Sequence, residues 1–176
     1  MYEDLKKYIR SVKDFPKQGI MFRDITTLLK DPSGIKFTLD SLLLQTKNIH
    51  IDKVAGIESR GFIFGALLAE KLNIGFIPIR KPGKLPAEKI RAEYSLEYGV
   101  DVLEIHKDAI LPGEKVLVHD DLLATGGTAA AACKLIEMLG GEVVQISFII
   151  ELSFLSGRDK LKKYLVNSLI KYSDEN

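Results

Sequence analysis

An acidic pair followed by a small glycine-containing turn is the part of this sequence best suited to chemistry. Asp120 and Asp121 come directly after the apolar residues 116–118, and residues 124–128 read Ala-Thr-Gly-Gly-Thr before an alanine-rich segment. Glycine lets backbone amides approach an anion closely, and the N-terminus of a following helix favours negative charge. Carboxylates only accept hydrogen bonds, so they repel phosphate and suit sugar hydroxyls. The combination points to a ribose 5-phosphate.

The same residues allow a second interpretation, in which they have no ligand. The glycines would then make a tight turn between a strand and a helix, and the acids would cap the helix. Two better-known nucleotide-binding patterns do not occur in the sequence. It contains neither the G-x-x-x-x-G-K-[ST] loop of nucleoside triphosphate binding nor the G-x-G-x-x-G dinucleotide fingerprint.

The elements that position these residues follow an alternating pattern. Strands are predicted for the short apolar runs at 54–57, 74–79, 116–118 and 143–150, and residues 100–105 alternate like an edge strand. Helices are predicted for residues 5–12, 61–72, 128–139 and a segment beginning at Asp31-Pro32-Ser33. Residues 81–98 are charged and predict a long loop or hairpin. This order is typical of an α/β protein with right-handed crossovers and a mainly parallel, doubly wound sheet flanked by helices.

Ligands of such sheets bind beyond the carboxyl ends of the strands. Three segments of this chain, residues 58–61, 80–84 and 120–128, follow or end predicted strands. We therefore expect them to meet at one edge of the sheet. No internal repeat or linker divides the sequence, so residues 1–176 are expected to form a single domain.

Composition narrows the classes of function. The chain has 176 residues, 46% of them hydrophobic, and a formal net charge of +1. This balance suits a globular domain and disfavours non-specific binding to nucleic acid, which needs a dense basic surface. Cys133 is the only cysteine, and the sequence has no Cys/His cluster with metal-ligand spacing. With no signal-like start and no long apolar run, the expectation is a cytoplasmic protein without a membrane partner.

Residues 116–128 resemble the signature of the type I phosphoribosyltransferase family that binds 5-phosphoribosyl-1-pyrophosphate (PRPP). The Leu-Leu-Ala-Thr-Gly-Gly-Thr form of residues 122–128 resembles the adenine-specific branch of that family. Further similar segments are residues 15–26, 58–65, 80–86, 94–99, 151–152 and 157–158. The resemblance implies the family's twisted sheet, a small N-terminal hood over the base formed by residues 1–30, and a mobile loop at residues 85–98. It also implies conversion of adenine and PRPP to AMP and pyrophosphate, with Mg²⁺ carried by PRPP rather than by direct protein ligands, and a homodimer.

The resemblance assigns roles to individual residues. Asp120 and Asp121 hold the ribose 2- and 3-hydroxyls. The 5-phosphate is bound by Ala124, Thr125, Gly126, Gly127 and Thr128. The pyrophosphate is bound by Ser59, Arg60, Lys81 and Lys84, and the peptide between Glu58 and Ser59 is expected to be cis.

Catalysis and base recognition use residues outside the signature. Glu97 is the implied proton donor to the purine, and Tyr98 beside it belongs to the substrate-binding set. Arg60 and Lys84 are the implied catalytic cations, since negative charge develops on the leaving pyrophosphate. In the hood, Phe22 stacks on adenine while the main chain of Met21 and Arg23 reads the edge of the base.

Three alternatives remain open from the sequence. His119 stands where the family usually has an apolar residue, and it is either a tolerated substitution at a strand end or a titratable group beside the acidic pair. The protein could instead be a PRPP-responsive regulator on the same fold, although it lacks a basic face or an added DNA-binding module. It could also act on hypoxanthine, guanine or xanthine.

Overall fold

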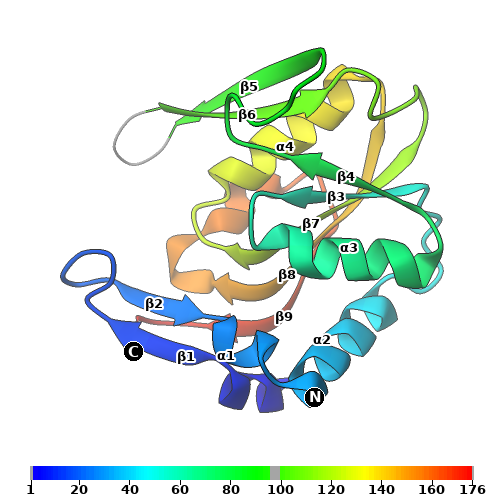
Figure 1. Cartoon of the computed structure of the whole chain (residues 1–176). Coiled ribbons are helices and arrows are strands. Elements are labelled where there is room, and N and C mark those ends of the chain that lie inside the picture. Colours follow the sequence, from blue (N-terminus) through cyan, green and yellow to red (C-terminus); the bar gives the residue numbers. More distant parts are fainter. Residues whose placement is uncertain (1, 96–99, 176) are drawn as a thin grey trace.

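Five parallel strands form the central sheet of the computed structural model, which describes residues 2–95 and 100–175 (Figure 1). They are β3 (Lys53–Ile57), β4 (Gly75–Ile79), β7 (Lys115–Leu123), β8 (Glu142–Leu152) and β9 (Val166–Tyr172). Their spatial order is β4-β3-β7-β8-β9. The predicted parallel α/β sheet is therefore confirmed. Because the chain winds outward in opposite directions from β3 and β7, a crevice is expected beyond their carboxyl ends.

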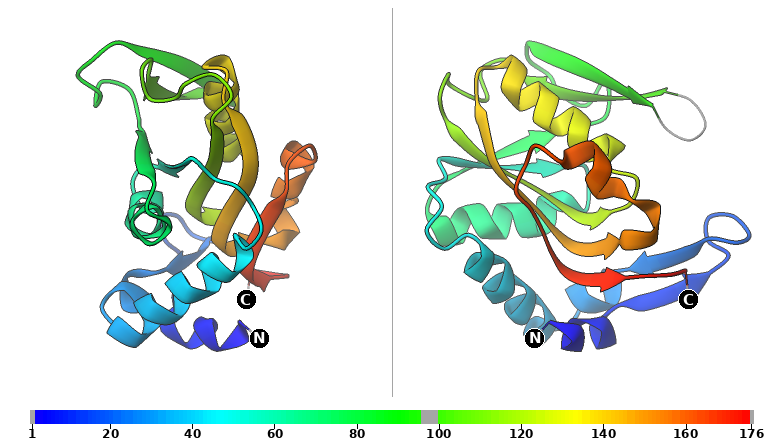
Figure 2. Two further views of the ribbon diagram at one scale, coloured as in Figure 1. Left: turned by 90° about the vertical axis from the view of Figure 1, so that its right-hand side faces the viewer. Right: turned by 180° about the vertical axis from the view of Figure 1, so that it is seen from behind.

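Helices cover both faces of the sheet (Figures 1 and 2). They are α2 (Pro32–Gln45) and α3 (Gly61–Leu72) on one face and α4 (Gly127–Met138) on the other. Successive strand residues point to opposite faces. Val54 and Leu117 accordingly pack on the α3 side, and Ala55 and Val118 pack on the α4 side. This two-sided burial explains why the central strands are continuous apolar runs rather than alternating ones.

The N-terminal segment differs from its prediction. A 3-10 helix, η1 (Glu3–Tyr8), replaces the first part of the expected helix over residues 5–12. The rest is a strand, β1 (Arg10–Lys13), because it pairs antiparallel with β2 (Met21–Asp24). A short helix, α1 (Thr26–Leu29), follows β2 and was not predicted. Helical spacing of apolar residues was misleading here because a cross-strand partner decided the backbone conformation.

The loop-or-hairpin segment forms a hairpin. Its strands β5 (Lys89–Ser95) and β6 (Val100–His106) make a separate two-stranded sheet that packs against α4. The hairpins β1–β2 and β5–β6 extend past the same end of the main sheet, where β3 and β7 finish (Figure 1). They therefore flank the edge at which ligand binding is expected.

The C-terminal part contains the 3-10 helices η2 (Ser153–Leu155) and η3 (Gly157–Leu161) before β9. The strand β9 was not predicted, and it lies beside the β1–β2 hairpin (Figure 2). Within residues 2–95 and 100–175, no helix has the length and apolar character needed to cross a membrane.

Candidate active site

The acidic pair lies inside β7 rather than after it, because this strand continues to Leu123. Asp121 is only 3% exposed, and Asp120 is half-buried. Burial raises the pKa of Asp120, and the neighbouring charge of Asp121 raises it further. Burial also raises the pKa of Asp121, and the Arg60 guanidinium opposes this shift. Donors that approach the pair, such as hydroxyl groups, would stabilise its ionised form.

Arg60 joins the turn after β3 to the acidic pair. Its Nε lies 2.8 Å from Oδ2 of Asp121. The next residue, Gly61, begins α3, and a Cβ there would lie 2.8 Å from the carbonyl oxygen of His119 and 2.9 Å from Oδ1 of Asp120. Only glycine lets α3 approach β7 this closely, so this contact fixes Arg60 beside the carboxylates. The Glu58–Ser59 peptide is cis, as expected.

The glycine-containing turn forms a small cup with a volume of about 80 Å³. Gly126 has φ +76°, which a side chain would disfavour, and it precedes the first residue of α4. The cup is lined by Asp120, Leu122, Leu123, Ala124, Thr125, Gly126, Thr128, Ala129 and Phe148. Gly127 is buried at the helix start. The cup therefore combines a helix N-terminus with hydroxyl-bearing residues, which suits a phosphate.

Gly157 supports this cup from behind. A Cβ on Gly157 would lie 2.1 Å from the carbonyl oxygen of Ala124, and one on Gly126 would lie 2.2 Å from the carbonyl oxygen of Gly157. The two backbones are thus in direct contact. Sequence reasoning noted residues 157–158 only as a similar segment, and no local pattern links them to residues some thirty positions earlier.

An open cleft of about 390 Å³ adjoins the cup. It is lined by Glu58, Ser59, Arg60, Lys81, Tyr94, Asp120, Asp121, Leu122 and Thr128. Asp120, Leu122 and Thr128 line both spaces. The structure therefore brings the segments 58–61 and 120–128 together with Lys81, as the sheet rule predicted. Tyr94, from the β5–β6 hairpin, is a cleft residue that sequence reasoning did not single out.

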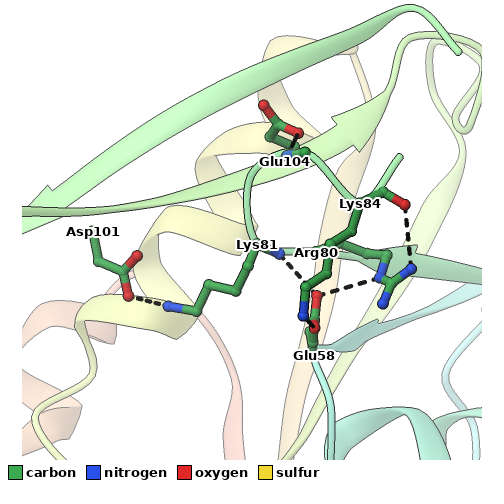
Figure 3. A network of polar contacts seen from close by, with 7 residues as sticks. Glu58, Arg80, Lys81, Lys84, Asp101 and Glu104 are labelled. Carbon is green, nitrogen blue, oxygen red and sulfur yellow. Dashed lines mark hydrogen bonds and ion pairs between the residues drawn. The ribbon is translucent and has the colours of Figure 1, made fainter. Parts of the chain in front are cut away.

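A network of ion pairs holds the two lysines (Figure 3). Lys84 does not line the cleft, and its Nζ is paired with Oε1 of Glu58. Lys81 lines the cleft, and its Nζ is paired with Oδ2 of Asp101 and lies 3.0 Å from the Tyr94 hydroxyl. Burial alone would raise the pKa of the Glu58 carboxyl, but hydrogen bonds from Lys84, the Lys81 amide and Arg80 hold that pKa below its usual range.

The hood residues lie on β2. The Phe22 ring packs edge-on against Phe15, with centroids 5.1 Å apart, and the Arg60 guanidinium lies 5.1 Å from the Phe22 centroid. Arg60 thus connects the hood to the acidic pair. The Arg23 side chain is 4% exposed and stacks at 3.9 Å on the Tyr172 ring. Met21 is half-buried at the start of the strand.

The backbone of β2 has one edge outside any sheet. In the part of the chain that the structure describes, β2 pairs only with β1. The Arg23 side chain points toward Tyr172 on β9 and toward the Glu175 carbonyl, and Arg23 is opposite Ser11 in the β1–β2 ladder. Glu97 and Tyr98, the expected proton donor and its neighbour, lie outside the described residues.

His119 is fully buried, and its Nδ1 lies 2.8 Å from Oγ of Ser147 on β8. Burial lowers the pKa of His119 to about 3. The ring is therefore neutral at physiological pH, and its interpretation as a group that titrates near neutrality is wrong. The structure supports the alternative, a tolerated substitution, although His119 lies in the middle of β7 rather than at a strand end.

The sequence and the fold are those of a known family. Residues 26–172 match the model of the phosphoribosyl transferase domain, and the chain belongs to this family. A curated relative from Christiangramia forsetii, an adenine phosphoribosyltransferase, is 61% identical over 97% of this chain and 99% of its own length.

Solved structures agree with this assignment. The crystal structure of adenine phosphoribosyltransferase from Thermoanaerobacter pseudethanolicus has 53% identity and a TM-score of 0.96, covering 98% of this chain and 100% of that one. The Saccharomyces cerevisiae enzyme, solved with an imino-altritol bisphosphate and adenine, has 41% identity and a TM-score of 0.92, covering 96% and 98%.

Proposed function

We propose that the protein transfers the phosphoribosyl group of PRPP to adenine, which forms AMP and releases pyrophosphate. It is a glycosyltransferase of purine salvage. The observation that carries this proposal is the continuity of the phosphate-sized cup with the cleft that contains the acidic pair, in a chain whose relatives are named adenine phosphoribosyltransferases. A sugar that bears a terminal phosphate and free hydroxyls fits this arrangement.

The phosphoribosyl group would lie across the boundary between cup and cleft. Residues 124–128 bind the 5-phosphate in this proposal, and Asp120 and Asp121 accept hydrogen bonds from the ribose hydroxyls. Support comes from the shared lining, since Asp120 and Thr128 face both spaces. The 5-phosphate and the hydroxyls of one ribose can then be held at the same time.

The leaving group would lie on the Arg60 side of the cleft. Ser59, Arg60 and Lys81 line this part, and Lys84 is next to it through Glu58. The ribose acquires positive charge in an oxocarbenium-like transition state while pyrophosphate acquires negative charge. Arg60 and Lys84 act as catalytic cations by stabilising this developing charge.

Mg²⁺ fits the proposal as a companion of PRPP. Among the described residues, no group of three or more His, Cys, Asp or Glu side chains could hold a metal ion. Magnesium prefers oxygen ligands and is often bound through one or two carboxylates together with substrate phosphates. We therefore expect the ion to arrive with PRPP, bound by its phosphate oxygens, its hydroxyls and water rather than by direct protein ligands. The ion would supply extra positive charge to the leaving pyrophosphate.

Adenine would bind between the cleft and the hood, which we assign to residues 1–30 of a single domain spanning residues 1–176. Phe22 stacks on the base, and the main chain of Met21 and Arg23 distinguishes an amine from a carbonyl, because donor and acceptor roles invert between them. Glu97 protonates the purine and Tyr98 contributes to substrate binding. These two roles rest on the sequence.

One incubation tests the function. Purified protein with PRPP and Mg²⁺ should form AMP from adenine and should form no nucleotide from hypoxanthine, guanine or xanthine. The double variant Asp120→Ala/Asp121→Ala, with unfolding measured in parallel, should lose this activity while remaining folded. Nucleotide formation from another base alone would reassign the substrate. Absence of any product from the wild-type protein would contradict the transferase function.

The assembly and location are also proposals. The protein is a homodimer in the cytoplasm, as the family resemblance implies, and it binds neither nucleic acid nor membranes. Light scattering coupled to size-exclusion chromatography should give twice the chain mass of 19.6 kDa. A gel shift with purine-gene operator DNA should show no complex, and a specific complex would favour the regulatory alternative.

A further inference from the structure

Glu58 is a carboxylate beside the cleft that is much less exposed than the cations it contacts. Its side chain is 8% exposed, whereas those of its partners Arg80 and Lys84 are 32% and 48% exposed. A buried carboxylate beside a site for a highly charged anion opposes binding unless cations neutralise it. The positions of the cations around each carboxylate oxygen of Glu58 therefore indicate its role.

The two carboxylate oxygens of Glu58 have separate partners (Figure 3). Oε2 accepts from the Lys81 amide at 2.9 Å and from Nε of Arg80 at 3.2 Å. Oε1 accepts from Nζ of Lys84. One oxygen therefore binds the backbone turn after β4, and the other binds a flexible, half-exposed side chain.

The turn of residues 80–84 has further attachments that do not involve Glu58. Arg80 and Glu104 exchange two backbone hydrogen bonds, of 2.9 and 2.7 Å. The Gly83 amide donates to Oε2 of Glu104 at 3.1 Å, and Nη1 of Arg80 donates to the Lys84 carbonyl at 3.2 Å. The backbone of this turn is thus held in place when Lys84 leaves Glu58.

We propose that Glu58 is a positioning residue that acts as an exchangeable counter-ion: it holds Lys84 until pyrophosphate, free or as part of PRPP, takes this lysine, and it takes Lys84 back when pyrophosphate leaves. This inference rests on the proposed function. The exchange replaces one charge-assisted hydrogen bond by another, so it reduces the net affinity for pyrophosphate and favours product release. Oε2 keeps the turn in place throughout.

Glutamine at position 58 separates the two roles of the carboxylate, which are to hold the turn of residues 80–84 and to bind Lys84. Glu58→Gln can retain an oxygen at the Oε2 position for the Lys81 amide and Arg80, while its amide nitrogen, a donor, replaces the acceptor of Lys84. Lys84 is then free before pyrophosphate arrives. We expect Glu58→Gln to bind magnesium pyrophosphate about tenfold more tightly than wild type, which corresponds to one charge-assisted hydrogen bond that no longer has to be broken.

A double-mutant cycle with Lys84→Met tests whether the effect acts through this lysine. Isothermal titration of magnesium pyrophosphate would be carried out on wild type, both single variants and the double variant. Lys84→Met alone should bind pyrophosphate more weakly than wild type. In the Lys84→Met background, Glu58→Gln should increase affinity clearly less than in the wild-type background, because the pair that it disrupts is already absent and only the repulsion between the carboxylate and the anion is relieved. The matched control is Glu70→Gln, which removes an exposed glutamate paired with Lys71 at 3.1 Å and should leave the affinity unchanged.

Two results would overturn the exchange. One is unchanged or weaker pyrophosphate binding by folded Glu58→Gln, and the other is an equal gain in the presence and absence of Lys84. A crystal structure of the wild-type protein with magnesium pyrophosphate gives a test that does not depend on variant folding. Nζ of Lys84 should contact a phosphate oxygen while Arg80 and the Lys81 amide remain on Glu58, and Lys84 still bound to Glu58 would refute the proposal.

The wild-type activity assay distinguishes failure of this inference from failure of the proposed function on which it rests. If wild type forms AMP from adenine and PRPP but the cycle shows no coupling between Glu58 and Lys84, only the exchange fails. If wild type forms no AMP, the proposed function itself fails.

Discussion

Alanine at Gly157 tests whether backbone packing positions the phosphate cup. A Cβ on this residue would lie 2.1 Å from the Ala124 carbonyl oxygen and 3.0 Å from the Gly126 nitrogen. Cβ atoms do not approach other heavy atoms within 3.0 Å, so the two segments would have to separate by roughly 1 Å at the closer contact. The φ angle of Gly157 itself is not in the left-handed region, so the steric contact alone is tested.

The expected loss of activity follows from this displacement. Misplacing substrate-binding groups by about 1 Å can cost on the order of 100-fold in rate. For Gly157→Ala we therefore expect kcat/KM for PRPP to fall about 100-fold, which is about 2.7 kcal/mol of lost transition-state stabilisation. The KM for adenine should change much less, because the hood does not contain Gly157.

Steady-state AMP formation at varied PRPP measures the effect, and thermal unfolding shows whether the variant remains folded. Gly75→Ala is a suitable control, because a Cβ there meets only Cγ of Lys53 at 3.7 Å, an ordinary contact. This control should retain wild-type kinetics. A folded Gly157→Ala protein with normal kcat/KM for PRPP would refute the argument that this contact positions the cup for the 5-phosphate.

Further predictions concern three buried groups, His119, Asp24 and Cys133. The pKa of His119 falls from 6.5 to about 3 on folding, so its contribution to stability is complete above pH 6.5 and is lost on acidification. Denaturant unfolding of the wild type should show a loss of about 2 kcal/mol in the free energy of unfolding between pH 6.5 and 4.5. His119→Val should lack this loss. Wild type and His119→Val should nevertheless share one pH profile of PRPP affinity near neutrality, and a difference there would contradict a neutral ring. Hydrogen bonds from the Thr26 amide and from Arg10 outweigh burial and lower the pKa of Asp24 to about 2. Asp24→Asn should therefore lower the free energy of unfolding by about 2 kcal/mol at pH 7. The stability difference between wild type and variant should shrink as pH falls from 3.8 toward 2. Burial raises the pKa of the Cys133 thiol to about 12, so a thiol reagent should modify it only at the rate of unfolding, and fast labelling of the native protein would disprove its burial.

The sequence predicted the parts of the candidate site that are contiguous in the chain. The cup and the acidic pair occupy residues 120–128, where glycine conformation, a strand end and a helix start are all local properties. The parts that depend on distant residues were not predicted. Gly157 is recognised as necessary only when its backbone is seen against Ala124, and the pairing of Lys84 with Glu58 joins residues 26 positions apart.

The strands, too, divide into those that the sequence predicts and those that depend on distant residues. β3, β7 and β8 were predictable because both of their faces are buried, which requires consecutive apolar residues. β9 was not, because Asn167 and Ser168 interrupt its apolar residues and its place at the sheet edge demands less burial. β1 is mostly exposed, and only its pairing with β2 makes it a strand. Tertiary contact decided these elements, and such contact leaves little trace in a single sequence.

The cations that we propose for pyrophosphate binding are all paired with carboxylates in the structure. Arg60, Lys81 and Lys84 each have a carboxylate partner, in Asp121, Asp101 and Glu58 respectively. In the binding mode that we propose, each cation must loosen such a pair to bind phosphate, so the net gain in the ground state is small. Interactions that strengthen as charge moves onto pyrophosphate raise the rate, whereas uniformly tight binding would only slow its release. Paired cations therefore suit an enzyme that must release the same anionic group that it helps to expel.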